Sequence, residues 1–378
     1  MKILVLANID FSKPYGTHTR PFYICKYLNR MGNEILVLCS HGIQGSGSLQ
    51  FVNLKSMRLR NPFKYICMLP EVIYYIKTFD PHIIYSHSNT FTIVAYLSKL
   101  MSHSKALIVL DKHGSWAMEQ MTSSIYPVLK FVELLALKCA NKVIAASEDI
   151  KLALIGIYKI PSRKVVVVTN GVDPEVFHPL PKNKLRTLTK RLGEDKKIII
   201  FPAPRNFVSN VLAIKFMYEV MRQLREKYSK IILLITGGGR IIKPKPSNVI
   251  YLGFVDNLNV YLNLADVAVA PYPKEALCGG ARNKVLEYFA CKVPVVSTKE
   301  GMRGIEDALP QIHFILANDD PSDFAEKISS TLCMDNKTLR NIVHNAYQLV
   351  VTKYNWRKSA QLLYDEIVTL LRDSSSND

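Results

Sequence analysis

The sequence predicts an α/β protein of two doubly wound, Rossmann-like domains that face each other across a cleft. The length of 378 residues suits two cores of roughly 180 residues better than one. Short apolar runs alternate with helical patterns, as in parallel sheets whose strands are joined by crossover helices. This pattern stops near residue 180 and starts again near residue 197, so the second half repeats the architecture of the first.

In the first half, the helix between the first two strands begins at Pro21 and ends at Gly32. Proline is tolerated in the first turn of a helix, and glycine is favoured just after the last turn. The strands expected in this half are Ile3–Ala7, Ile35–Cys39, Ile83–Ser86, Ala106–Leu110, Lys142–Ala146 and Val165–Val168.

The domain boundary is expected where the turn residues Asn170 and Gly171 are followed by prolines and the charged segment 182–197. We therefore place the N-terminal domain at residues 1–180, the C-terminal domain at 181–355 and a final helix at 356–372. The strands expected in the second half are Lys197–Phe201, Ile231–Ile235, Val249–Leu252, Val267–Ala270 and Val293–Ser297.

Composition limits the class of protein. Hydrophobic residues make up 48% and charged residues 21%, as in a folded soluble protein. The seven cysteines are scattered and form no CxxC pair, which argues against a disulfide framework or a zinc site. No apolar stretch approaches the length of a membrane span. The expected location is the cytoplasm, with peripheral attachment to the inner face of the cell membrane left open.

The formal charge of +18 predicts an anionic partner, which could be a phosphorylated substrate, an anionic lipid surface or a nucleic acid. The sequence contains no recognisable zinc finger, basic helix or base-stacking motif, so no nucleic acid is expected as a partner.

Two segments carry a resemblance to a known family. Residues 143–179 read VIAASEDIKLALIGIYKIPSRKVVVVTNGVDPEVFHP, and residues 265–304 read ADVAVAPYPKEALCGGARNKVLEYFACKVPVVSTKEGMRG. They resemble the GT-B glycosyltransferases, in particular the retaining family 4, also called group 1. The resemblance implies transfer of a sugar from a nucleotide-diphosphate donor to a hydroxyl acceptor, without a metal or cofactor, and a C-terminal helix that packs back toward the N-terminal domain.

Candidate donor-binding residues cluster before and within one predicted helix. Gly279 and Gly280 precede it, so their backbone N–H groups and the positive helix end form a phosphate site, with Arg282 and Lys284 adding charge. The resemblance implies that Glu287 binds the donor ribose. Many relatives have a second glutamate where this chain has Gly279, and Glu275 is the candidate replacement.

Three further donor-binding candidates follow from the resemblance. Arg205 stands where relatives place an arginine that neutralises the donor diphosphate, whereas a lysine common in relatives is replaced near Asn210. Arg282 and Lys284 are expected to supply the missing charge. The amides of Gly16 and Thr17, in the loop after the first strand, are expected to touch the diphosphate.

Two histidines, His87 and His113, follow predicted strands, where side chains of a doubly wound sheet meet a ligand. The resemblance places His113 near the transferred sugar, while His87 is interpreted as a packed, structural histidine. The candidate catalytic residues are therefore His113, Arg205 and Lys284.

A basic and apolar stretch predicts a membrane surface, with a solvated basic loop as the alternative. Its cations are Lys55, Arg58, Arg60 and Lys64. A lipid-linked glycan or glycolipid acceptor would fit such a surface. Two functional alternatives stay open for the whole chain: another GT-B enzyme such as a nucleotide-sugar epimerase, and a non-catalytic subunit that binds a nucleotide sugar.

Overall fold

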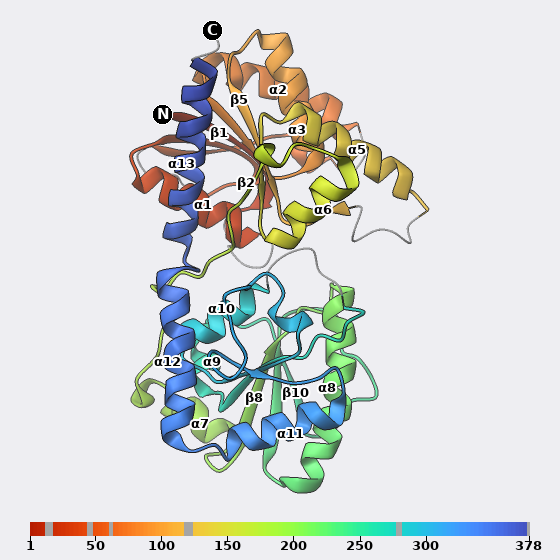
Figure 1. Ribbon diagram of the computed structural model, residues 1–378, viewed down its shortest axis with the longest axis vertical. Helices are drawn as coiled ribbons and strands as arrows, with labels where there is room; N and C mark the ends of the chain where they lie inside the picture. The colour runs from red at the N-terminus through yellow and green to blue at the C-terminus, as the bar shows by residue number, and fades with distance from the viewer. Residues whose placement is uncertain (12–17, 44–47, 60–62, 117–123, 277–281, 376–378) are drawn as a thin grey trace. The chain divides into compact units, whose positions relative to one another are not determined.

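The computed structural model describes residues 1–11, 18–43, 48–59, 63–116, 124–276 and 282–375. The chain forms two compact units (Figure 1). The first combines Met1–Asn170 with the C-terminal segment from Trp356, and the second is Gly171–Asn355. The chain thus passes between the units at the predicted Asn-Gly turn, whereas the sequence placed the domain boundary after residue 180.

The described strands of the first unit form one parallel sheet in the order β3-β2-β1-β4-β5-β6-β7. Their bounds are β1 (Lys2–Asp10), β2 (Glu34–His41), β3 (Leu49–Asn53), β4 (Ile83–Ser86), β5 (Leu107–Lys112), β6 (Lys142–Ala145) and β7 (Val165–Val167). The strand β3 was not predicted, because it lies at the sheet edge and its half-exposed residues give no continuous apolar run.

Helices cover both faces of this sheet (Figure 1). One face packs against α1 (Thr19–Arg30) and α13 (Trp356–Ser375). The other face packs against α2 (Lys64–Phe79), α3 (Asn89–Ser102), α5 (Tyr126–Cys139) and α6 (Glu148–Tyr158). The prediction that the C-terminal helix returns to the N-terminal domain is confirmed, since α13 lies on α1 and the Trp356 and Tyr23 rings stack with centroids 5.7 Å apart.

The second unit repeats this design with a parallel sheet in the order β10-β9-β8-β11-β12-β13. Its strands are β8 (Lys197–Pro202), β9 (Ile231–Thr236), β10 (Val249–Gly253), β11 (Val267–Ala270), β12 (Val295–Ser297) and β13 (Ile315–Leu316). Its helices are α7 (Arg186–Leu192), α8 (Val208–Lys227), α9 (Leu258–Leu264), α10 (Asn283–Ala290), α11 (Pro321–Leu332) and α12 (Asn336–Thr352). The predicted class, two doubly wound Rossmann-like sheets, is confirmed.

Strand order fixes where a ligand can bind in each unit. The order reverses between β1 and β4 in the first sheet and between β8 and β11 in the second. Doubly wound sheets bind ligands outside the carboxyl ends of their strands at such a switch point. His87 follows β4, Arg205 follows β8 and Tyr272 follows β11, so these side chains stand at the two switch points.

Candidate active site

In the second unit, Arg205 lies against a glycine loop that follows β9. Its Nε and Nη2 donate to the carbonyl oxygen of Gly239 at 3.1 and 2.7 Å. Its guanidinium carbon lies 4.6 Å from the centre of the Tyr251 ring. Nη1 is buried and has no hydrogen-bond partner among the described residues. The bonds to Gly239 and the contact with Tyr251 therefore fix the orientation of this guanidinium.

Two glycines allow this close approach. Gly237 and Gly239 have φ values of 101° and 108°, a region that residues with a Cβ rarely adopt. A Cβ on Gly239 would stand 2.8 Å from the Cβ of Arg205, whereas one on Gly238 would meet nothing within 4 Å. The glycine loop therefore sets the position of Arg205, a role that the sequence analysis missed.

Lys284 lies in the first turn of α10 and its ammonium is held at the end of β8. It donates to the carbonyl oxygen of Pro202 at 2.5 Å, to Asn210 Oδ1 at 3.3 Å and to the Tyr272 hydroxyl. Asn210 Oδ1 also accepts from the Tyr272 hydroxyl at 2.7 Å. The Asn210 side chain thus provides an acceptor for both Lys284 and Tyr272.

Arg282 is buried and forms an ion pair that the sequence analysis did not foresee. Its Nη2 donates to the carbonyl oxygen of Ala276 at 2.6 Å and to Glu300 Oε1 at 3.1 Å, and its guanidinium stacks 3.6 Å from the Tyr272 ring centre. Glu300 also binds Arg303 at 2.7 Å. The Glu300 carboxylate therefore binds two guanidinium groups, those of Arg282 and Arg303.

Two of the predicted carboxylates have different surroundings. Burial raises the pKa of Glu287 to about 7, and the nearby Lys284 charge acts in the opposite direction. Glu275 is exposed and lies 4.0 Å from Lys274, with both side chains largely in water. A solvated carboxylate of this kind carries no sign of a prepared binding site.

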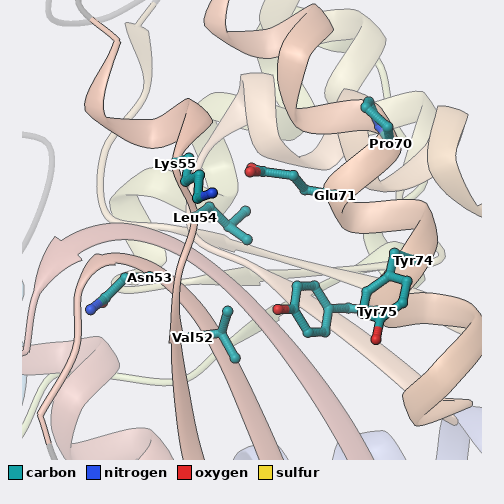
Figure 2. Close-up of a pocket in the computed structure, with 8 residues that line it drawn as sticks. All are labelled: Val52, Asn53, Leu54, Lys55, Pro70, Glu71, Tyr74 and Tyr75. Atoms are coloured by element: carbon teal, nitrogen blue, oxygen red, sulfur yellow. The ribbon is translucent and has the colours of Figure 1, made fainter.

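The predicted residues Gly16, Thr17, Arg60, Gly279 and Gly280 lie outside the described residues. Lys55, Arg58 and Lys64 are described, and the first two are exposed. Lys55 borders a hollow of about 390 Å³ between the end of β3 and α2 (Figure 2). Val52 and Tyr75 line it from the strand and the helix, and none of the predicted catalytic residues takes part.

In the first unit, the end of β5 carries a buried ion pair. Arg20 Nε donates to both carboxylate oxygens of Asp111, at 3.1 and 2.8 Å, and its Nη1 reaches the carbonyl oxygen of Val168 and Asn170 Oδ1 at 2.8 and 3.0 Å. The Tyr85 hydroxyl donates to the same carboxylate. Burial alone would raise the pKa of Asp111, but the Arg20 charge, the nearby His113 and His87 and the hydrogen bonds from Arg20 hold it well below its usual range.

His87 and His113 meet beside this carboxylate. His87 Nδ1 lies 3.4 Å from His113 Nε2 and 3.5 Å from Asp111 Oδ2. Burial lowers the pKa of His87 to about 3 and of His113 to about 4, with Asp111 acting in the opposite direction. Both imidazoles are therefore neutral near pH 7. The structure brings the two predicted histidines into contact.

The three side chains His87, Asp111 and His113 place potential ligand atoms within 4.8 Å of one another. Neutral imidazoles and a carboxylate are metal-ligand types. However, both oxygens of Asp111 already accept from Arg20, and a divalent cation would stand beside that guanidinium. The donor set therefore fits a hydrogen-bonded acid–base cluster better than a metal centre.

Comparison with known protein families shows which family has this fold. The model of the family described as Glycosyltransferase Family 4 matches residues 16–176, and the model described as Glycosyl transferases group 1 matches residues 196–333. The GT-B class has two parallel Rossmann-like sheets, and its C-terminal helix packs on the N-terminal domain, as α13 packs on α1 here. This chain is a glycosyltransferase of that class. It belongs to glycosyltransferase family 4, a family of retaining enzymes that use nucleotide-sugar donors.

Individual relatives are distant. The glycosyltransferase EpsD of Bacillus subtilis is 24% identical over 86% of both chains, and the capsular polysaccharide biosynthesis glycosyltransferase CapM of Staphylococcus aureus is 26% identical over 65% of both. Among solved structures, a glycosyltransferase of Rickettsia africae has 18% identity, a TM-score of 0.75 and 98% coverage of each chain. HepE of Anabaena in complex with UDP and glucose has 16% identity and a TM-score of 0.77, covering 98% of this chain and 100% of its own.

Every helix within the described part of the chain is too short or too polar to cross a lipid bilayer.

Proposed function

We propose that the second unit binds the nucleotide-diphosphate sugar and that the first unit presents the acceptor hydroxyl. The observation that carries this is Arg205 at the switch point after β8, whose guanidinium is fixed by the glycine loop and whose buried Nη1 has no partner within the described parts of the chain. Arg205 and Lys284 would bind the diphosphate, because charge-assisted hydrogen bonds to phosphate oxygens are among the strongest in proteins. Glu287 would accept hydrogen bonds from the ribose hydroxyls.

The reaction then needs little covalent chemistry from the protein. The bond from the anomeric carbon to the diphosphate oxygen breaks, and a bond to the acceptor oxygen forms on the same face of the sugar. The acceptor proton leaves with the diphosphate. Arg205 and Lys284 stabilise the charge that develops on the leaving group, a contribution that is often the largest in such sites. Neutral His113 orients the transferred sugar by hydrogen bonding, and no metal or cofactor is needed.

A panel of nucleotide sugars tests the donor site. We expect one UDP or GDP sugar to raise the Tm of the protein, with UDP-glucose tried first because the similar HepE structure holds UDP and glucose. Arg205→Ala and Glu287→Ala should abolish the shift. Glu275→Ala is the matched control, since that carboxylate is solvated. A shift that survives both site variants, or no shift with any donor, contradicts the proposal.

We also propose that the acceptor is a lipid-linked glycan or glycolipid at the cytoplasmic face of the membrane. The support is an outer apolar surface on the helices α2, α3 and α5. Its exposed residues are Phe63, Ile66, Tyr74, Leu97, Leu100, Met101, Ile125, Val128, Phe131 and Leu135. On α13, which covers the other face of the sheet, Leu362 is the one large apolar side chain exposed among the described residues.

Charge favours lipid as the partner of this outer apolar surface. The three helices contain five lysines and two glutamates. Glu133 is buried, and Glu71 accepts from the Ser56 hydroxyl. Lys55 and Arg58 stand at the entrance to α2, and each cation near an anionic bilayer contributes about 1 kcal/mol. Helices that combine exposed apolar side chains with lysines fit the interface of an anionic membrane.

Vesicle sedimentation tests this surface. The protein should sediment with phosphatidylserine vesicles at low salt and less so at high salt, because salt screens surface charge. A Val128→Ser, Phe131→Ser double variant should bind less, while Leu362→Ser on α13 should bind normally. Absence of binding even at low salt contradicts membrane attachment. If the wild-type protein instead sediments as a dimer and the double variant as a monomer, the outer apolar surface is an interface between two copies of this chain.

The two alternative functions differ in their products. A nucleotide-sugar epimerase would convert the donor without an acceptor, and a non-catalytic subunit would bind the donor without turnover. We expect donor consumption to require acceptor, as measured by product analysis with and without a bacterial glycolipid extract.

A further inference from the structure

The strand β5 ends in two charged residues that point to opposite faces of the sheet. Asp111 faces α1, where it pairs with Arg20. Lys112 faces α5, where its ammonium pairs with Glu133 and donates to Asn89 Oδ1 at 3.0 Å. Side chains alternate along a strand, so consecutive residues must find partners on different sides. His113 follows these two buried ion pairs directly.

Glu133 binds the segment on both sides of His113. Its carboxylate accepts from Lys112 before the histidine, and from Ser115 Oγ at 3.1 Å and the Trp116 amide at 3.2 Å after it. The Tyr158 hydroxyl of α6 donates at 2.6 Å. Glu133 is fully buried. One carboxylate on a rigid helix thus fixes residues 112, 115 and 116 together.

We propose that Glu133 is a positioning residue for His113, holding the loop that carries the imidazole in one conformation during sugar transfer. This inference rests on the proposed role of His113 at the transferred sugar. Glu133 acts through the backbone and not on the substrate, because its carboxylate is enclosed by protein donors.

A gain in stability does not by itself explain why the ion pair of Lys112 and Glu133 is buried here. Moving two charges out of water costs several kcal/mol per ion, and apolar residues of similar volume often serve equally well in a core. A carboxylate gives what apolar packing does not, namely directional bonds to the Ser115 hydroxyl and the Trp116 amide. Reacting groups need placement within a fraction of an ångström, and a misplacement of about 1 Å can cost roughly 100-fold in rate.

A double-mutant cycle separates positioning from structural support. We expect Glu133→Gln to lower kcat about 10-fold to 100-fold, with the donor-induced Tm shift unchanged because the proposed diphosphate and ribose contacts lie in the second unit. In a His113→Ala background, Glu133→Gln should lower kcat no further. Tyr158→Phe is the matched control, since it removes a donor to Glu133 that does not belong to the His113 loop.

Two further variants keep the test decisive if Glu133→Gln folds poorly. Ser115→Ala removes one bond between Glu133 and the loop, and Lys112→Met with Glu133→Gln removes the buried charges together. Both should lower kcat, and neither should do so in the His113→Ala background. Equal losses with and without His113 overturn the positioning role. If His113→Ala alone keeps normal turnover, the proposed role of His113 fails instead.

Discussion

The carboxyl of Glu287 has a pKa of about 7 because burial removes water from its charged form, and Lys284 only partly offsets this. The charged carboxylate is the better acceptor for two ribose hydroxyls. We therefore expect the affinity for the nucleotide sugar that raises the Tm to increase between pH 6 and pH 8, as measured by titration calorimetry. Glu287→Gln should bind weakly and show no such pH dependence. Wild-type affinity that is flat over this range contradicts the role of Glu287.

The same pKa has a consequence for stability. The folded state holds the Glu287 proton more tightly than the unfolded chain, whose glutamate titrates near pH 4.5. The unfolded state therefore binds fewer protons between about pH 4.5 and pH 7, so this group's contribution to stability is lost as the pH rises through that window. His87 and His113, whose pKa values are lowered, act in the opposite direction between about pH 6.5 and pH 4.

At the scale of elements, the glycine loop after β9 offers a prediction with an internal control. Gly239→Ala places a Cβ 2.8 Å from that of Arg205 in a backbone conformation with φ of 108°, whereas Gly238→Ala meets open space. We expect Gly239→Ala to weaken donor binding about 10-fold, because Arg205 must shift and charge-assisted bonds to phosphate depend on alignment. Gly238→Ala should bind normally. Equal donor affinities in the two variants would show that the loop does not position Arg205.

Most strands could be predicted from the sequence because they are buried on both faces and read as continuous apolar runs. Edge strands lack that signal. Leu49–Asn53 is half exposed, and Ile315–Leu316 is only two residues long. Ser88 and Ser147 lie two residues after β4 and β6, and their hydroxyls accept from the Phe91 and Ile150 amides, so each serine begins the helix that follows its strand.

The candidate site was predictable only in part. Residues within a local motif could be proposed from the sequence: Lys284 as a cation beside a helix start, and Glu287 from the resemblance of the motif to the family. The partners that define their chemistry come from distant positions: Arg20 binds Asp111 across 91 residues, and Lys284 reaches Pro202 across 82. Asp111 did carry a signal, since a charged residue ending an apolar strand must find a buried partner. Nothing in the sequence identified Arg20 as that partner.

At the scale of the whole molecule, the chain leaves the first unit at Asn170 and returns to it at Trp356, so the first core depends on the last helix. Trp356 is almost fully buried and stacks on Tyr23. Trp356→Ala should destabilise the first unit by about 3 to 5 kcal/mol, the usual cost of removing a large buried aromatic side chain. The core of the second unit contains no residue of α13 among those described and should keep its stability.

Calorimetry can separate the two units because a ligand stabilises the unit that binds it. A nucleotide sugar that binds at the proposed site of Arg205 and Glu287 should raise the unfolding temperature of the second unit. Trp356→Ala should lower that of the first unit and leave the ligand-dependent transition in place. A single transition that moves with both the substitution and the ligand would mean that the units unfold together. In that case the docking of α13 on α1 would stabilise the donor-binding unit as well, and donor affinity itself should fall when Trp356 is replaced.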